Sequence, residues 1–69
     1  MSFNVSNEAK IQLLTQRVEA LNLEGYQHEL NKKSAEALNN AEVVEQSNTA
    51  ISIIESAIAV HEAELADLA

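Results

Sequence analysis

The sequence predicts an all-α protein folded as an antiparallel, coiled-coil-like hairpin of two helices. Along two stretches, apolar residues recur at alternating spacings of three and four, as at the a and d positions of a heptad repeat. The 69 residues include no Pro and one Gly, so strong helix breakers are almost absent. Asn39 and Asn40 separate the two stretches, and Asn tolerates the left-handed backbone that ends many helices.

The first helix is expected over residues 7–38, after an N-terminal arm of residues 1–6. Ser6 or Asn7 can cap its start, and Glu8 then places a carboxylate at the positive end of the helix dipole. The seam that should face the second helix is apolar at its start and weaker further on. This first seam contains Ile11, Leu14, Val18, Leu21, Gly25, His28, Lys32 and Ala35.

The second helix is expected over residues 41–68, which completes a single helical domain. Asn40 can cap this helix, with Glu42 in its first turn. Branched aliphatic residues dominate the second seam, so it should be the stronger half of the contact between the helices. It contains Val44, Ser47, Ile51, Ile54, Ile58, His61, Leu65 and Leu68.

The position of the turn decides which residues meet. A turn at residues 39–40 sets residue i against residue 79 − i, which pairs Leu21 with Ile58 and brings the two seams together. A turn at residues 33–34 would instead set Leu21 against Gln46. Because the first choice brings the two apolar seams together, the turn is predicted at residues 39–40.

The competing architecture is one long helix in a coiled coil, because Asn is only mildly unfavourable inside a helix. Charge argues against it. Residues 1–33 carry four acidic and four basic side chains, whereas residues 34–69 carry seven acidic side chains and no Lys or Arg. Parallel rods would place the acidic halves side by side, whereas a hairpin lays the neutral helix against the acidic one.

The chain has more apolar surface than a two-helix hairpin can cover. A second apolar set lies off the seams, and its large members form the predicted interface: Leu13, Leu23, Tyr26, Leu30, Ile53 and Val60. A chain this short buries little surface, and without Cys it has no disulfide to stabilise it. We therefore expect a homo-oligomer, most simply a dimeric four-helix bundle; the alternative is that the second set binds a different protein.

No catalytic, cofactor-binding or metal-ligating residue is predicted. His28 and His61 each have a carboxylate one turn away, Glu24 and Glu64, but the hairpin would separate the two His by roughly 15 Å along its axis. The Glu-x-x-His pairs of dimetal bundles are absent, and Ser and Thr are scattered without a His and an acid beside them. The single Gly excludes a phosphate-binding loop. The chain is therefore not expected to be an enzyme.

The net charge of −7 argues against nucleic acid or an anionic membrane as a direct partner, because both require a basic surface. The sequence shows no signal peptide and no transmembrane segment, so a cytoplasmic location is expected. Carboxylates on the second helix could imitate the phosphates of a nucleic acid; these are Glu42, Glu45, Glu55, Glu62, Glu64 and Asp67.

These observations predict a non-enzymatic, homo-oligomeric helical protein that acts as an adaptor, an assembly factor or a small structural subunit. The alternative is an acidic inhibitor that occupies a basic site of a nucleic-acid-binding protein. In its small size, acidity, Asn content and all-helical character the chain resembles accessory proteins of tailed bacteriophages. That resemblance covers no particular residue, and it implies an accessory role without assigning a site.

Overall fold

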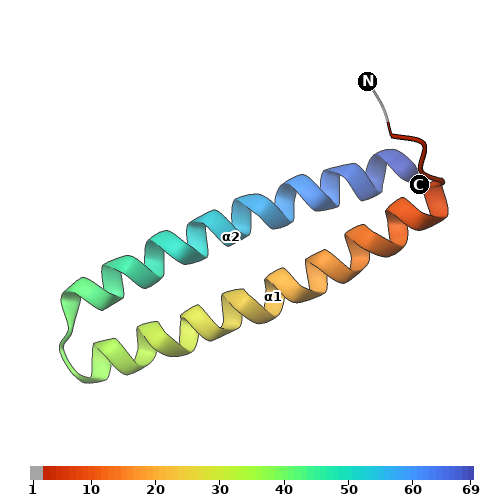
Figure 1. The fold of residues 1–69 in the computed structure, drawn as a ribbon. Helices are drawn as coiled ribbons and strands as arrows, with labels where there is room; N and C mark the ends of the chain where they lie inside the picture. Colours follow the sequence, from red (N-terminus) through yellow and green to blue (C-terminus); the bar gives the residue numbers. More distant parts are fainter. Residues whose placement is uncertain (1–2) are drawn as a thin grey trace.

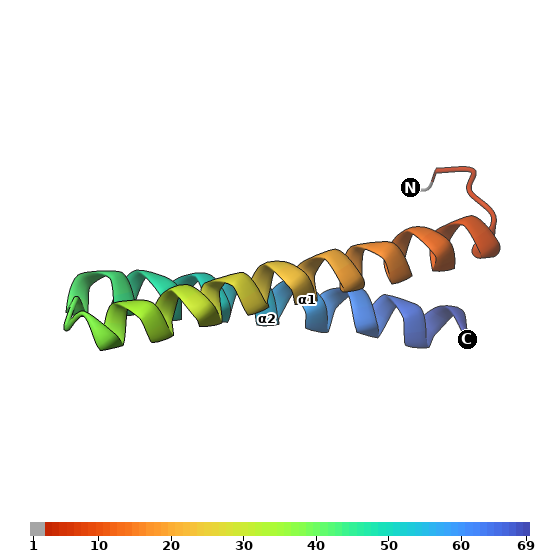
Figure 2. The ribbon, with the colours of Figure 1, turned by 90° about the horizontal axis from the view of Figure 1, so that it is seen from below.

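The computed structural model describes residues 3–69 as a hairpin of two long helices, α1 (Asn7–Ala37) and α2 (Ala41–Leu68). The helices run antiparallel, and the described ends of the chain lie together, opposite the connecting turn (Figure 1). Seen from below, they cross at a shallow angle and stay side by side along their length (Figure 2). The longest dimension is 49 Å, whereas one helix over residues 7–68 would span about 93 Å. The continuous rod is therefore not the fold.

Side chains cap both helices at their first residues. The Ser6 hydroxyl accepts a hydrogen bond from the Ala9 N–H at 3.2 Å, and the Asn40 side-chain oxygen accepts one from the Val43 N–H at 3.2 Å. Each bond satisfies a backbone donor that the first turn of a helix leaves without a partner. Of the two residues expected to cap α1, Ser6 is the cap and Asn7 is the first helical residue, and the cap expected at Asn40 is confirmed.

The turn between the helices uses the left-handed backbone expected of Asn. Asn39 has a φ of 57° and follows α1, which ends at Ala37, one residue earlier than expected. The Asn40 N–H donates to the Ala35 carbonyl at 2.8 Å, and the Asn39 N–H donates to the Glu36 carbonyl at 3.1 Å. This pair of bonds is a Schellman motif, which satisfies carbonyls at the end of α1. Asn40 then also caps α2, so the turn is very short.

The hairpin buries few side chains completely. Among residues 3–69, only Ala35 and Ser47, each 4% exposed, and Ile54, 7% exposed, are buried. Ile11, at 38%, is the most exposed of the expected seam residues. The remaining seam positions are half-buried: Leu14, Val18, Leu21, Gly25, His28, Lys32, Val44, Ile51, Ile58, His61, Leu65 and Leu68. Two helices alone therefore give this chain a thin core.

Small residues allow the helices to approach closely at two levels. At the middle of the hairpin, a Cβ placed on Gly25 would lie 3.5 Å from Ile54 Cγ2, so the expected pairing of Gly25 with Ile54 is confirmed. Near the turn, Ala35 on α1 and Ser47 on α2 are both buried. Close approach at these levels brings backbone and side-chain atoms into van der Waals contact, which stabilises the hairpin.

Candidate interaction surface

The six side chains of the predicted interface lie on the surface of the single chain. Leu13, Leu23, Tyr26, Leu30, Ile53 and Val60 are between 45% and 65% exposed. Isolated exposed apolar side chains are common on proteins. Here they are numerous on a hairpin with only three buried residues among residues 3–69, so the exposed apolar surface outweighs the core.

The structure separates these six residues into three regions. Leu23 and Leu30 lie on the back of α1, because a residue two positions from Leu21 is rotated by about 200° around the helix. Tyr26 lines a groove on one side of the hairpin, together with Glu29 and Glu55. The other three, Leu13, Ile53 and Val60, lie toward the opposite side. One flat contact therefore cannot use all six residues.

The hairpin has a groove between its helices on each side. The first, which we name the alanine groove, has a volume of about 340 Å³ and is lined by Arg17, Ala20, Leu21, Glu24, Ala57 and His61. The second, the charged groove, is also about 340 Å³ and is lined by Glu29, Lys32, Lys33, Glu36, Asn48, Ile51 and Glu55. Glu55 follows Ile54 and Ala57 precedes Ile58, so these two residues lie on opposite flanks of the α2 seam.

Ile53 and Val60 lie on the same flank of α2 as Ala57. Successive residues of a helix are rotated by about 100°, which places both within roughly 60° of Ala57 around the axis. On α1, Leu13 lies one turn before Arg17, on the flank that faces the alanine groove. The alanine groove is therefore bordered by three of the six predicted interface residues.

Arg17, Ala20, Glu24 and Ala57 were not among the predicted interface residues, although they line the groove at its centre. Arg17 and Glu24 are seven residues apart, which places them two turns apart on one flank of α1. This spacing of opposite charges is visible in the sequence. The sequence does not show which flank of α2 lies beside these two charges. In the structure it is the flank that carries Ala57.

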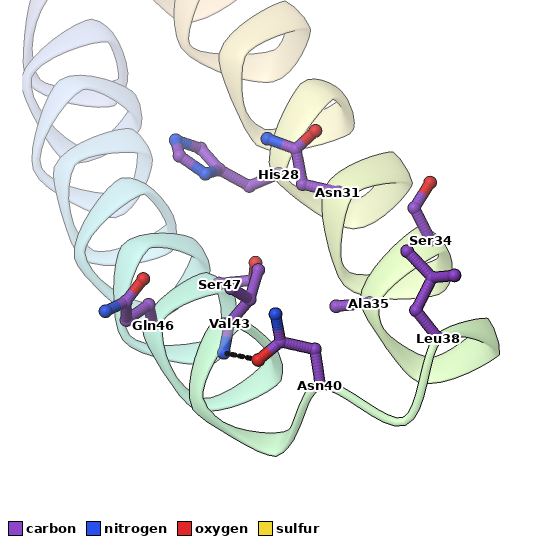
Figure 3. Close-up of a pocket in the computed structure, with 9 residues that line it drawn as sticks. All are labelled: His28, Asn31, Ser34, Ala35, Leu38, Asn40, Val43, Gln46 and Ser47. Atoms are coloured by element: carbon purple, nitrogen blue, oxygen red, sulfur yellow. Dashed lines mark hydrogen bonds between the residues drawn. The ribbon is translucent and has the colours of Figure 1, made fainter.

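A third groove lies near the turn and has a volume of about 370 Å³. His28 and Ala35 extend into it from α1 toward α2, and the Asn40 cap of α2 lies at its lower end (Figure 3). The other lining residues are Asn31, Ser34, Leu38, Val43, Gln46 and Ser47. Among residues 3–69, no Asp, Glu, Lys or Arg lines this groove.

The two histidines lie in different grooves. His28 lines the groove near the turn, and His61 lines the alanine groove. His61 Nδ1 is 2.6 Å from the carbonyl oxygen of Ala57, one turn earlier, which fits an Nδ1–H donating to that oxygen. Within the part of the chain that the structure describes, no three His, Cys, Asp or Glu side chains gather closely enough to hold a metal ion.

Neither helix within residues 3–69 has an apolar stretch that is long enough to cross a membrane. Comparisons with protein-family models, curated proteins and solved structures find no match to this chain. A fold as simple as a helical hairpin serves many unrelated functions. The function is therefore inferred from the chemistry of the surface.

Proposed function

We propose that this protein is a non-enzymatic helical interaction or structural protein that works as a homo-oligomer, most simply a dimer of hairpins in a four-helix bundle. In this form it would serve as an adaptor, an assembly factor or a small structural subunit. One observation carries the proposal. Large apolar side chains, each between 45% and 65% exposed, outnumber the three buried residues among residues 3–69.

Self-association provides the core that the single hairpin lacks. Chains under about 70 residues need a disulfide, a metal or oligomerisation to reach useful stability, and this chain contains no Cys. Burial of a half-exposed Leu, Ile or Val side chain contributes about 1 kcal/mol, and a two-fold interface buries each such residue twice. Isologous dimers are also the commonest assembly of soluble proteins.

The acidic-inhibitor alternative has less support. The six carboxylates of α2 are all exposed, as such a role requires. They do not form one ridge, however, because Glu55 and Glu62 lie on one flank of the seam and Glu64 lies on the other. A chain of phosphates is continuous, so a mimic of nucleic acid needs its charges on one face.

The oligomer is tested by light scattering combined with small-angle X-ray scattering over a range of concentrations. The expected result is a mass of twice the 7.5 kDa chain or a higher multiple, in a particle wider than one hairpin. Leu23→Glu and Val60→Glu sample two of the exposed regions, and at least one of them should lower the mass because a buried, unpaired carboxylate is costly. A monomer at every concentration would refute the proposal.

A further inference from the structure

We propose that the alanine groove is the centre of a two-fold interface with a second copy of this chain. The α1 helices of the two copies run antiparallel across it, and Arg17 of each protomer pairs with the partner's Glu24. This proposal rests on the self-association proposed above and adds to it the location, the direction and the register of the contact.

The chemistry of the two sides selects the alanine groove. Beside it lie the small side chains of Ala20 and Ala57 and the exposed side chains of Ile53 and Val60. The charged groove is lined by three carboxylates, two Lys and an Asn. Burial of apolar groups is favourable, whereas burial of charged groups without complete pairing costs several kcal/mol each. A second copy of an acidic chain should therefore approach on the alanine side.

Arg17 and Glu24 are the two residues with permanent charges that line the alanine groove, and Glu64 lies two turns beyond Ala57 on the same flank of α2. Neither Arg17 nor Glu24 has an oppositely charged Lys, Arg, Asp or Glu one turn away on α1. The positions three and four residues to either side of Arg17 are Leu or Ala, and those around Glu24 are Leu, Ala, Gln and His. Two turns separate the pair, about 10.5 Å along the axis, so they are too far apart to pair with each other within one helix.

A two-fold axis perpendicular to α1, passing between residues 20 and 21, exchanges the levels of Arg17 and Glu24. Each Arg17 then lies at the level of the partner's Glu24, and one axis creates two ion pairs. If the two α1 helices packed against each other in parallel and in register, Arg17 would lie beside the partner's Arg17, and the two Glu24 side chains would also repel. Charge complementarity of this kind determines the direction and register of a contact.

The same axis gives a consistent contact on α2. In this hairpin residue i of α1 lies near residue 79 − i of α2, as Gly25 and Ile54 show, so the axis crosses α2 between residues 58 and 59. It therefore sets Ala57 against the partner's Val60. A large side chain then meets a small one on each side of the axis, which suits close packing. Ala20 lies beside the axis on α1, where its small side chain allows the two α1 backbones to approach each other.

Charge reversal tests the ion pairs. Arg17→Glu and Glu24→Arg should each weaken the homodimer by roughly tenfold or more, because each replaces two attractive pairs by two repulsive ones. A 1:1 mixture of these two variants should restore a heterodimer of wild-type affinity, and the double variant should restore a homodimer. The matched controls are Lys33→Glu and Glu29→Arg, which make the same charge changes in the charged groove and should leave the dimer intact.

Single engineered cysteines test the direction, since the natural chain has none. Lys10 and Asn31 are related by the same axis, so Lys10→Cys and Asn31→Cys chains should cross-link to each other through a short thiol linker. Two Lys10→Cys chains should not, because the axis places these residues about 31 Å apart.

The outcomes separate the two proposals. A wild-type monomer refutes both. A dimer that tolerates both charge reversals, or that links Lys10→Cys to itself, refutes the antiparallel pairing and leaves self-association intact. Loss of the dimer in Leu23→Glu alone would also overturn the pairing, because it would place the contact on the back of α1.

Discussion

Gly25 faces the buried side chain of Ile54 across the middle of the hairpin, yet we expect Gly25→Ala to stabilise the protein. The φ angle of Gly25 is not positive, so Ala can adopt its backbone without strain. A Cβ at this position would lie 3.5 Å from Ile54 Cγ2, which is an ordinary van der Waals distance. The new methyl group therefore fits without moving α2.

The size of the effect follows from helix propensity. Gly is about 1 kcal/mol less favourable than Ala inside a helix, because it loses more backbone entropy on folding. The added methyl contact with Ile54 contributes a few tenths of a kcal/mol at a half-buried site. Because a change of 1 kcal/mol shifts the Tm of a small domain by about 4–8 °C, Gly25→Ala should raise the Tm by roughly 5 °C.

Gly25→Leu is the matched control. Leu is nearly as good a helix former as Ala, but its further atoms would extend from a Cβ that already touches Ile54. Overpacking of this kind costs about 1–3 kcal/mol, so the Tm should fall below that of Gly25→Ala. Both variants are followed by thermal denaturation with circular dichroism at one protein concentration, since dimerisation couples to stability. A lower Tm for Gly25→Ala than for the wild type would refute the reasoning.

Four further results are expected. The circular dichroism spectrum should be that of an almost wholly helical protein, and substantial strand signal would contradict the fold. Asn39→Ala should cost about 1 kcal/mol because Asn39 has a φ of 57°, whereas Asn39→Gly should be neutral or stabilising in the same melts. Ile54→Ala should cost about 2–4 kcal/mol, because Ile54 is the largest buried side chain among residues 3–69; a loss below about 1 kcal/mol would mean that the seam is not the core. Spin labels at Gln16 and Glu64, diluted with unlabelled chains, should report the helix spacing of about 8–10 Å plus the label arms, and a separation near 70 Å would indicate an extended chain.

Local rules predict most of the hairpin from the sequence. The caps at Ser6 and Asn40 and the left-handed Asn39 depend on residues within one turn of each other, so the sequence contains all the information they need. The pairing of Gly25 with Ile54 followed from the position of that turn, because equal rises per residue on both helices fix which levels meet. The one-residue difference at the end of α1 reflects the Schellman turn, which takes Leu38 out of the helix.

The predicted interface shows where sequence reasoning stopped. Periodicity identified Leu13, Tyr26 and Val60 as residues off the seams, and the structure leaves all three exposed. Periodicity did not show that Tyr26 lines a groove with Glu29 and Glu55, on the other side of the hairpin from Leu13 and Val60. The sequence analysis treated the six residues as one interface. In the structure they lie in three separate regions of the hairpin surface.

The sequence by itself determined two helices, their caps and the level at which they meet, since heptad spacing and the backbone preferences of Asn act over a few residues. Only the tertiary structure decided that Arg17, Glu24 and Ala57 share one groove and that Glu29, Lys33 and Glu55 share the other. The physical reason is that periodicity gives the angle of a side chain around its own helix. Which flanks of two helices lie together depends on the direction and register in which the helices pack.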